Sequence, residues 1–139
     1  MRIFLDANIL FSAAKSSGAV RHFLAALHAS GHVLVADEYV ATEAQRNISA
    51  KAAPSSVEYL HALLSRIEVA SLQPRASRSS AADWLPEKDR PVLLAAIGQQ
   101  CDALVTGDRT HFGPGYGRTF DGVTLYSPAQ LALELWGKP

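Results

Sequence analysis

Ile3-Phe4-Leu5-Asp6 is the first of two segments that decide the predicted fold, and Ala103-Leu104-Val105-Thr106-Gly107-Asp108 is the second. Each is a short apolar run that leads to an aspartate, as expected of a buried strand that enters a loop. Ligands of an open parallel α/β sheet bind beyond the carboxyl ends of its strands. A carboxylate delivered there by an apolar strand is costly unless its charge has a partner, and a cation is the natural partner. The two segments therefore indicate parallel strands with a cation-binding edge.

Outward from these segments, the hydrophobic period switches between strand-like and helical spacing, which is typical of an α/β fold with a parallel sheet. Further strands are predicted at residues 33–36, 69–72 and 123–126. Helices are predicted at residues 20–30, 37–49, 54–67, 91–100 and from Ser127 onward. Capping chemistry supports two of these helices, because Asp37 is a suitable N-cap and Ser127 with Gln130 forms a capping box.

Two connections and one helix face complete the predicted elements. Residues 73–82, which include Arg75 and Arg78, are expected to be an exposed connection, and residues 107–122 are expected to be a loop. The helix after Pro54 is expected to bury a stripe at helical spacing that consists of Val57, Leu60, Leu64 and Ile67.

The composition indicates a single domain that covers residues 1–139, because 48% hydrophobic residues supply one core and the chain is too short for two ordinary domains. No apolar run approaches the ~20 residues that span a bilayer. Asp6 interrupts the N-terminal apolar stretch that a secretory signal requires. Cys101 is the only cysteine, which excludes an internal disulfide and a cysteine-rich zinc site. We therefore expect a soluble, cytoplasmic protein with no membrane segment.

The charge balance argues at first against a nucleic-acid ligand, because thirteen basic and thirteen acidic residues give a net charge of zero. The objection weakens if four of the acids form one metal-neutralised site. Nine acids then remain against thirteen bases, an excess of +4 over the rest of the surface.

The four acids in question are Asp6, Glu43, Asp89 and Asp108, and each also has an ordinary structural interpretation. Aspartates after a strand commonly cap a helix or shape a turn, which fits Asp6 and Asp108. Asp89 is a possible N-cap for the helix that begins at Pro91, and Glu43 lies inside a helix, where exposed glutamates are common. Taken singly, these residues leave both interpretations open.

Four segments are more specific when they are taken together. They are residues 3–10 (Ile-Phe-Leu-Asp-Ala-Asn-Ile-Leu), residues 41–48 (Ala-Thr-Glu-Ala-Gln-Arg-Asn-Ile), residues 85–97 with 102–108, and residues 123–131 (Val-Thr-Leu-Tyr-Ser-Pro-Ala-Gln-Leu). With these segments the sequence resembles the PIN-domain family over nearly its whole length, in particular the bacterial toxin-like (VapC-like) ribonucleases. The strand that leads into Thr-Gly-Asp is the most specific match, and the segment around Glu43 is the least specific.

This resemblance implies a three-layer α/β/α sandwich with a five-stranded parallel sheet in the order 3-2-1-4-5, in which Asp6 and Asp108 would meet. It also implies an acidic cluster that is catalytic and holds one or two Mg²⁺ or Mn²⁺ ions, formed by Asp6, Glu43, Asp89 and Asp108. Oxygen ligands without histidine or cysteine suit such hard cations. Expected supporting or substrate-binding residues are Asn8, Thr106 and Arg109.

The resemblance further implies hydrolysis of RNA phosphodiester bonds that leaves a 5′-phosphate and a 3′-hydroxyl. A small protein of this kind would be the toxin of a toxin-antitoxin pair, with an antitoxin that covers the acidic cleft, and would form a homodimer. Two other functions stay open. A non-catalytic PIN-like module would bind RNA or protein, and a haloacid-dehalogenase-like phosphatase would need an aspartate at the position of Asn8.

Three residues of the loop at 107–122 have weaker interpretations. Tyr116 and Arg118 could stack on a base and contact a phosphate, as in single-strand binding. His111 lies near Asp108, and we interpret it as a loop histidine rather than a catalyst.

Overall fold

The computed structural model describes residues 1–71 and 79–137. Residues 73–78 of the predicted connection, with Arg75 and Arg78, lie outside the described residues, as does Leu72 at the end of the third predicted strand. The described strands are β1 (Arg2–Leu5), β2 (Val33–Asp37), β3 (Glu68–Ala70), β4 (Ala103–Val105), β5 (Thr119–Phe120) and β6 (Val123–Tyr126). The α-helices are α1 (Ala7–Lys15), α2 (Ala19–Ala29), α3 (Glu38–Lys51), α4 (Pro54–Leu64), α5 (Arg90–Gly98) and α6 (Pro128–Trp136), and the 3₁₀ turns are η1 (Ser80–Ala82), η2 (Glu87–Asp89) and η3 (Gly113–Gly115).

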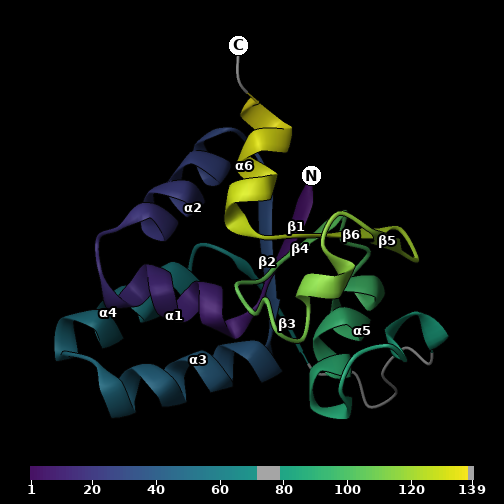
Figure 1. Cartoon of the computed structure of the whole chain (residues 1–139). Coiled ribbons are helices and arrows are strands. Elements are labelled where there is room, and N and C mark those ends of the chain that lie inside the picture. Colours follow the sequence, from purple (N-terminus) through teal and green to yellow (C-terminus); the bar gives the residue numbers. More distant parts are fainter. Residues whose placement is uncertain (72–78, 138–139) are drawn as a thin grey trace.

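The strands form one sheet in the order β3-β2-β1-β4-β6-β5, with the helices in layers on its two sides (Figure 1). Helices α1 to α4 pack against one another, and α6 packs against α2, on one side of the sheet. Helix α5 contacts β4, η1 and η2 on the other side. The predicted three-layer α/β fold and its parallel strand order are confirmed. Every helix of the described residues is too short or too polar to span a bilayer.

The strand count of the prediction was one too low. The fifth predicted strand is β6, and the predicted loop 107–122 contains the additional strand β5, which pairs antiparallel to β6. A strand of two residues is too short to show a period in the sequence.

Helix α1 was missing from the prediction. It begins immediately after β1, because the Asp6 side chain accepts a hydrogen bond from the Ala7 N–H and caps the helix. The predicted face of α4 was partly wrong as well. Leu60 and Leu63 are buried, whereas Val57 is exposed and the helix ends before Ile67.

The central strands β1 and β4 position the site. All of Ile3, Phe4 and Leu5 are fully buried, as are the three residues of β4, because helices cover both faces of a parallel sheet. Leu5 pairs with Val105 in parallel register, so the next residues, Asp6 and Thr106, leave the sheet side by side.

The loop after β4 is fixed by close packing at Gly115, and a substitution at this residue tests that packing. A Cβ atom at Gly115 would lie 2.5 Å from the Trp84 ring and 3.0 Å from Leu125. Gly115→Ala is expected to lower the free energy of unfolding by about 1–3 kcal/mol, as overpacking does. Urea unfolding measures the change, and Gly98→Ala is the control, because nothing lies within 4 Å of a Cβ there. Equal stability of the two variants would contradict the packing described here.

Candidate functional site

Asp6 and Thr106 form the centre of the site at the carboxyl ends of β1 and β4. The Thr106 hydroxyl donates a hydrogen bond of 2.8 Å to Asp6 Oδ2. Both residues are buried, at 7% and 0% exposure, so neither is solvated by bulk water. The two oxygens of the Asp6 carboxylate thus have different partners, because Oδ1 caps α1 and Oδ2 accepts from Thr106.

Asn8 extends this network from α1 to the loop after β4. Its amide nitrogen donates to Asp6 Oδ2 at 3.1 Å and to the Thr106 hydroxyl at 3.3 Å. Its amide oxygen accepts from the Gly107 N–H at 2.8 Å. The Thr106 hydroxyl also accepts from the Asp108 N–H at 3.1 Å, so one hydroxyl links Asp6 to the residue that carries the next acid.

Asp89 and Asp108 meet at His111. His111 Nδ1 lies 3.1 Å from Asp108 Oδ2, in hydrogen-bond geometry, and 3.0 Å from Asp89 Oδ2. Asp108 Oδ1 accepts from the His111 N–H at 3.1 Å, which shapes the turn. Within the described ranges, the ligand atoms of these three residues lie within 4.8 Å of one another and could hold a metal ion, whereas Asp6 and Glu43 are outside this group.

The donor set of this group fits a divalent cation. Asp89 Oδ2 is buried and accepts no hydrogen bond from any described residue, and His111 Nδ1 lies 3.0 Å from it as an ion-pair neighbour when the imidazole is protonated. Asp89 occupies the N-cap position of α5, but its side chain makes no capping bond there. A buried carboxylate oxygen without a hydrogen-bond donor is unfavourable by itself and favourable beside a cation. The two carboxylates are suitable ligands for Mg²⁺ or Mn²⁺, whereas the imidazole nitrogen of His111 departs from the predicted ligand set of oxygens alone and suits a transition metal better than Mg²⁺.

Charge and burial act together on Asp6. The pKa of the Asp6 carboxyl is raised from its ordinary 3.8 to about 6. Burial is the main cause, the hydrogen bonds from Thr106 and Ala7 lower the pKa, and the charges of Glu43 and Asp89 raise it. Glu43 itself is exposed on α3. The four predicted acids are therefore near enough to share an electrostatic environment, although the close carboxylate pair is Asp89 with Asp108.

Sequence reasoning missed two residues that border the acids. His111 was interpreted as a loop residue, although an aspartate three positions before a histidine is a spacing that allows contact in a turn. Tyr39 is the second residue of α3, and its hydroxyl donates a hydrogen bond of 3.5 Å to the Lys88 carbonyl in η2. Burial and then the charges of Glu43 and Asp89 raise the pKa of Tyr39. No spacing in the sequence relates Tyr39 to Lys88.

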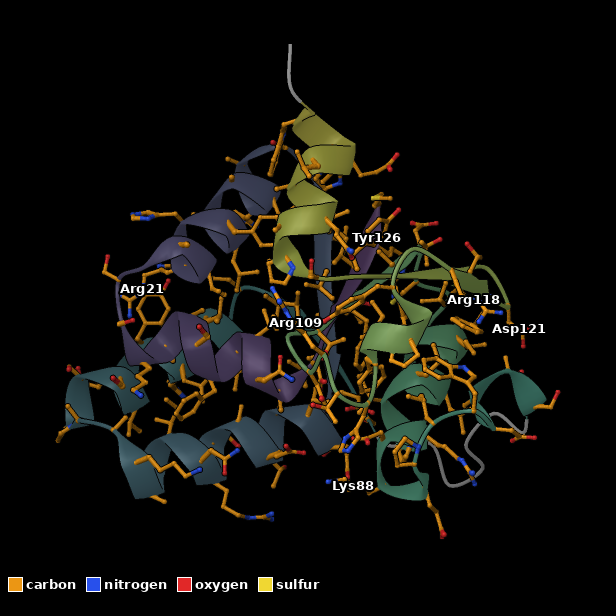
Figure 2. All side chains as sticks on the ribbon, in the orientation of Figure 1. Arg21, Lys88, Arg109, Arg118, Asp121 and Tyr126 are labelled. Carbon is orange, nitrogen blue, oxygen red and sulfur yellow. The ribbon has the colours of Figure 1, made fainter. Side chains whose placement is uncertain are left out.

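The three predicted loop side chains have different surroundings. Arg109 is exposed and lines an open pocket of about 510 Å³ with Gly113, Tyr116, Ser127, Ala129 and Gln130. The Tyr116 hydroxyl donates to the Thr106 carbonyl at 2.6 Å. Arg118 lies 5.5 Å from the Phe120 ring. Figure 2 shows Arg109 in the middle of the molecule near the start of α6, and Arg118 at its edge beside β5.

Comparison with known proteins gives a family match and three similar folds. A family model described as PIN domain matches residues 2–110. No curated protein matches the sequence. The chain is similar to VapBC2 from Rickettsia felis bound to a fragment of its promoter DNA, with a TM-score of 0.68 and 19% identity over 91% of this chain and 98% of that one.

Two further solved structures share the fold at lower identity. VapC20 from Mycobacterium tuberculosis, described as a toxin that cleaves the sarcin-ricin loop, has a TM-score of 0.61 and 12% identity over 85% of this chain and 98% of that one. FitAB bound to a DNA fragment has a TM-score of 0.63 and 13% identity over 91% of this chain and 94% of that one.

The raised pKa of Asp6 predicts how stability depends on pH without metal. The folded state holds this proton up to about pH 6, whereas the unfolded chain loses it near pH 3.8, so ionisation opposes folding. Stability is expected to fall as the pH rises between these values, by about 3 kcal/mol at full ionisation. The measurement is urea unfolding in EDTA from pH 4 to 7.5, for wild type and Asp6→Asn. As the pH rises, wild type should lose about this much stability relative to Asp6→Asn. A difference in stability that does not vary with pH would refute the raised pKa of Asp6.

Proposed function

The chain belongs to the PIN-domain family, and from this premise we propose that it is a divalent-metal-dependent endoribonuclease. The observation that carries the proposal is the buried Asp89 Oδ2, which accepts no hydrogen bond from the described residues and lies beside Asp108 at the end of the parallel strands. A carboxylate pair held in this way is best explained by a cation that the two acids share. The ion would be Mg²⁺ or Mn²⁺, held by Asp89 and Asp108 with Asp6 and Glu43 beside them.

The bound ion would supply Lewis-acid activation of water and stabilisation of the charge that develops on the phosphate. In the reaction, water attacks phosphorus and the bond to the 3′ oxygen breaks. The oxygen that leaves gains a proton, which gives a 3′-hydroxyl and a 5′-phosphate. The 2′-hydroxyl takes no part as nucleophile.

The side chains around the acids hold the site in place. Thr106 and Asn8 both donate to Asp6 Oδ2, so this oxygen is fixed in direction before any ligand arrives. Asp108 is fixed by its bond to the His111 N–H and by the bond from its own N–H to Thr106. Preorganised charges of this kind need little rearrangement during the reaction.

The same acids explain why RNA and a neutral net charge are compatible. Four carboxylates without a cation repel a phosphate, and Arg109 and Lys88 are the exposed basic residues next to Asp108 and Asp89. Figure 2 shows these two side chains well apart in the view, Arg109 near the start of α6 and Lys88 beside the lower end of α5. A substrate phosphate is therefore attracted to the acids themselves only when the cation is present.

The toxin role follows from the neighbours of the fold and is part of the proposal. VapBC2 and FitAB were solved as complexes on DNA, and VapC20 is described as an RNA-cleaving toxin. We infer by analogy that this chain is the toxin of a pair, forms a homodimer and is inhibited by an antitoxin that covers the acidic site. The RNA target would depend on the loops and basic residues around the site.

The proposal is tested by cleavage of a mixed RNA substrate with Mn²⁺ or Mg²⁺. Wild type is expected to cleave it and to lose activity in EDTA, and Asp6→Asn and Asp108→Asn are each expected to lose at least about 100-fold, since each removes a charge at the site. Glu58→Gln is the matched control, because Glu58 is an exposed acid on α4 away from the site.

The same assay separates the competing functions. A non-catalytic module would bind the RNA and leave it intact at every metal concentration. A phosphatase would release inorganic phosphate from a small ester, which Asn8 argues against because its amide occupies the place of the second acid and donates to Asp6. Cleavage that survives in both aspartate variants would refute the mechanism.

Thr106 provides a second test, because its hydroxyl positions Asp6 without being a ligand. Thr106→Val keeps the shape and removes the hydroxyl, and is expected to weaken Mn²⁺ binding by about 10–100-fold, as loss of a ligand-orienting bond does. Thr106→Ser restores the hydroxyl and is expected to rescue the affinity. Mn²⁺ affinity is measured by calorimetry on folded protein, and equal affinities for the valine and serine variants would show that the hydroxyl has no such role.

A further inference from the structure

The pocket lined by Arg109, Gly113, Tyr116, Ser127, Ala129 and Gln130 adjoins the acidic site but is separate from it. Thr106 is the residue that joins them. Its hydroxyl donates to Asp6 Oδ2, and its carbonyl accepts from the Tyr116 hydroxyl. Arg109 directly follows Asp108 in the chain, so the acidic site and the pocket are also joined through consecutive residues.

The polar groups of the pocket are donors. The Arg109 guanidinium makes no ion pair or hydrogen bond with any other described residue, although it carries a full charge. The amide oxygen of Gln130 accepts from the Ser127 N–H, which leaves its NH₂ group outside the capping box. The Ser127 hydroxyl accepts from the Gln130 N–H and keeps its own proton to donate. Among the described residues, no carboxylate lines this pocket, so its chemistry favours an anion with several acceptor oxygens.

Tyr116 gives the pocket a rigid aromatic wall. The phenol is fixed by its 2.6 Å bond to Thr106, and the backbone is fixed by the 2.8 Å bond from the Gly117 N–H to the Leu125 carbonyl. Burial raises the pKa of Tyr116, so its hydroxyl stays protonated and continues to donate. An immobile ring is suited to contact with a base or ribose, because little side-chain entropy remains to be lost on binding.

We propose that this pocket binds the nucleotide that adjoins the scissile phosphate of single-stranded RNA. Arg109 contacts the phosphate, with Gln130 and Ser127 as further donors, and Tyr116 contacts the nucleoside. A pocket of about 510 Å³ lies in the range of roughly 300–1,000 Å³ of small-molecule sites, which accommodates one nucleotide. The identification of the ligand as RNA rests on the proposed nuclease function, whereas the pocket and its donors do not.

The test measures nucleotide binding where cleavage is impossible. NMR titration of the whole chain in EDTA is carried out with AMP, CMP, GMP and UMP, and in separate arms with inorganic phosphate and with uridine. At least one monophosphate is expected to bind more tightly than both phosphate and uridine. Arg109→Gln is expected to weaken that binding about tenfold, the loss typical of one charge-assisted contact. Arg66→Gln is the matched control, an exposed arginine after α4 and outside the pocket, and is expected to bind as wild type does.

Three results would overturn the proposal. They are no binding of any monophosphate, binding no tighter than that of inorganic phosphate, and equal affinities of the Arg109 and Arg66 variants. RNA cleavage by the same proteins distinguishes this failure from failure of the nuclease function. Arg109→Gln is expected to raise KM for RNA about tenfold and to leave kcat nearly unchanged, because ground-state binding is what it removes. Nucleotide binding that depends on Arg109, without RNA cleavage, would support the proposed pocket and refute the nuclease function. RNA cleavage without nucleotide binding that depends on Arg109 would support the nuclease function and refute the proposed pocket.

Discussion

The hydrogen bond from the Thr106 hydroxyl to Asp6 Oδ2 is the interaction on which the rest of the site depends. It exists because β1 and β4 are adjacent and parallel, and because Leu5 pairs with Val105. The same threonine accepts from the Asp108 N–H and, through its carbonyl, from Tyr116. One buried side chain at the end of a central strand therefore aligns the first acid, the loop of the last acid and the wall of the adjacent pocket.

The acidic site lowers the stability of the fold. Burial opposes the charge on Asp6, and Asp89 keeps a buried oxygen that no described residue supplies with a hydrogen bond. The surrounding core offsets this, since β1 and β4 are covered on both faces and contribute only apolar side chains to it. Asp6 and Asp108 also have local structural roles, because Asp6 caps α1 and Asp108 shapes the turn to His111. The structural interpretation of these two aspartates is thus confirmed, whereas their functional interpretation stays a prediction.

The fold was predictable from the sequence because strand ends, caps and helix spacing are local signals. Asp37 and Ser127 cap the helices that they were expected to cap. Helix α1 was missed because no loop separates it from β1, and β5 because it has two residues. In the site, the positions of Asp6 and Thr106 follow from strand pairing. The contact of Asp89 with His111 does not, because it depends on how η2 and the loop after β4 pack, which no sequence spacing encodes.

The two outer strands have a consequence for how copies of this protein can associate. β3 has three residues and includes Glu68, which forms an ion pair with Arg2, and β5 has two residues. Such short edge strands offer few unpaired backbone groups to an incoming strand, which protects a sheet protein from edge-to-edge aggregation. Among the described residues, the edge strands thus disfavour extension of the sheet by a second copy. Self-association through the helical surfaces, where side-chain complementarity sets the specificity, is favoured instead.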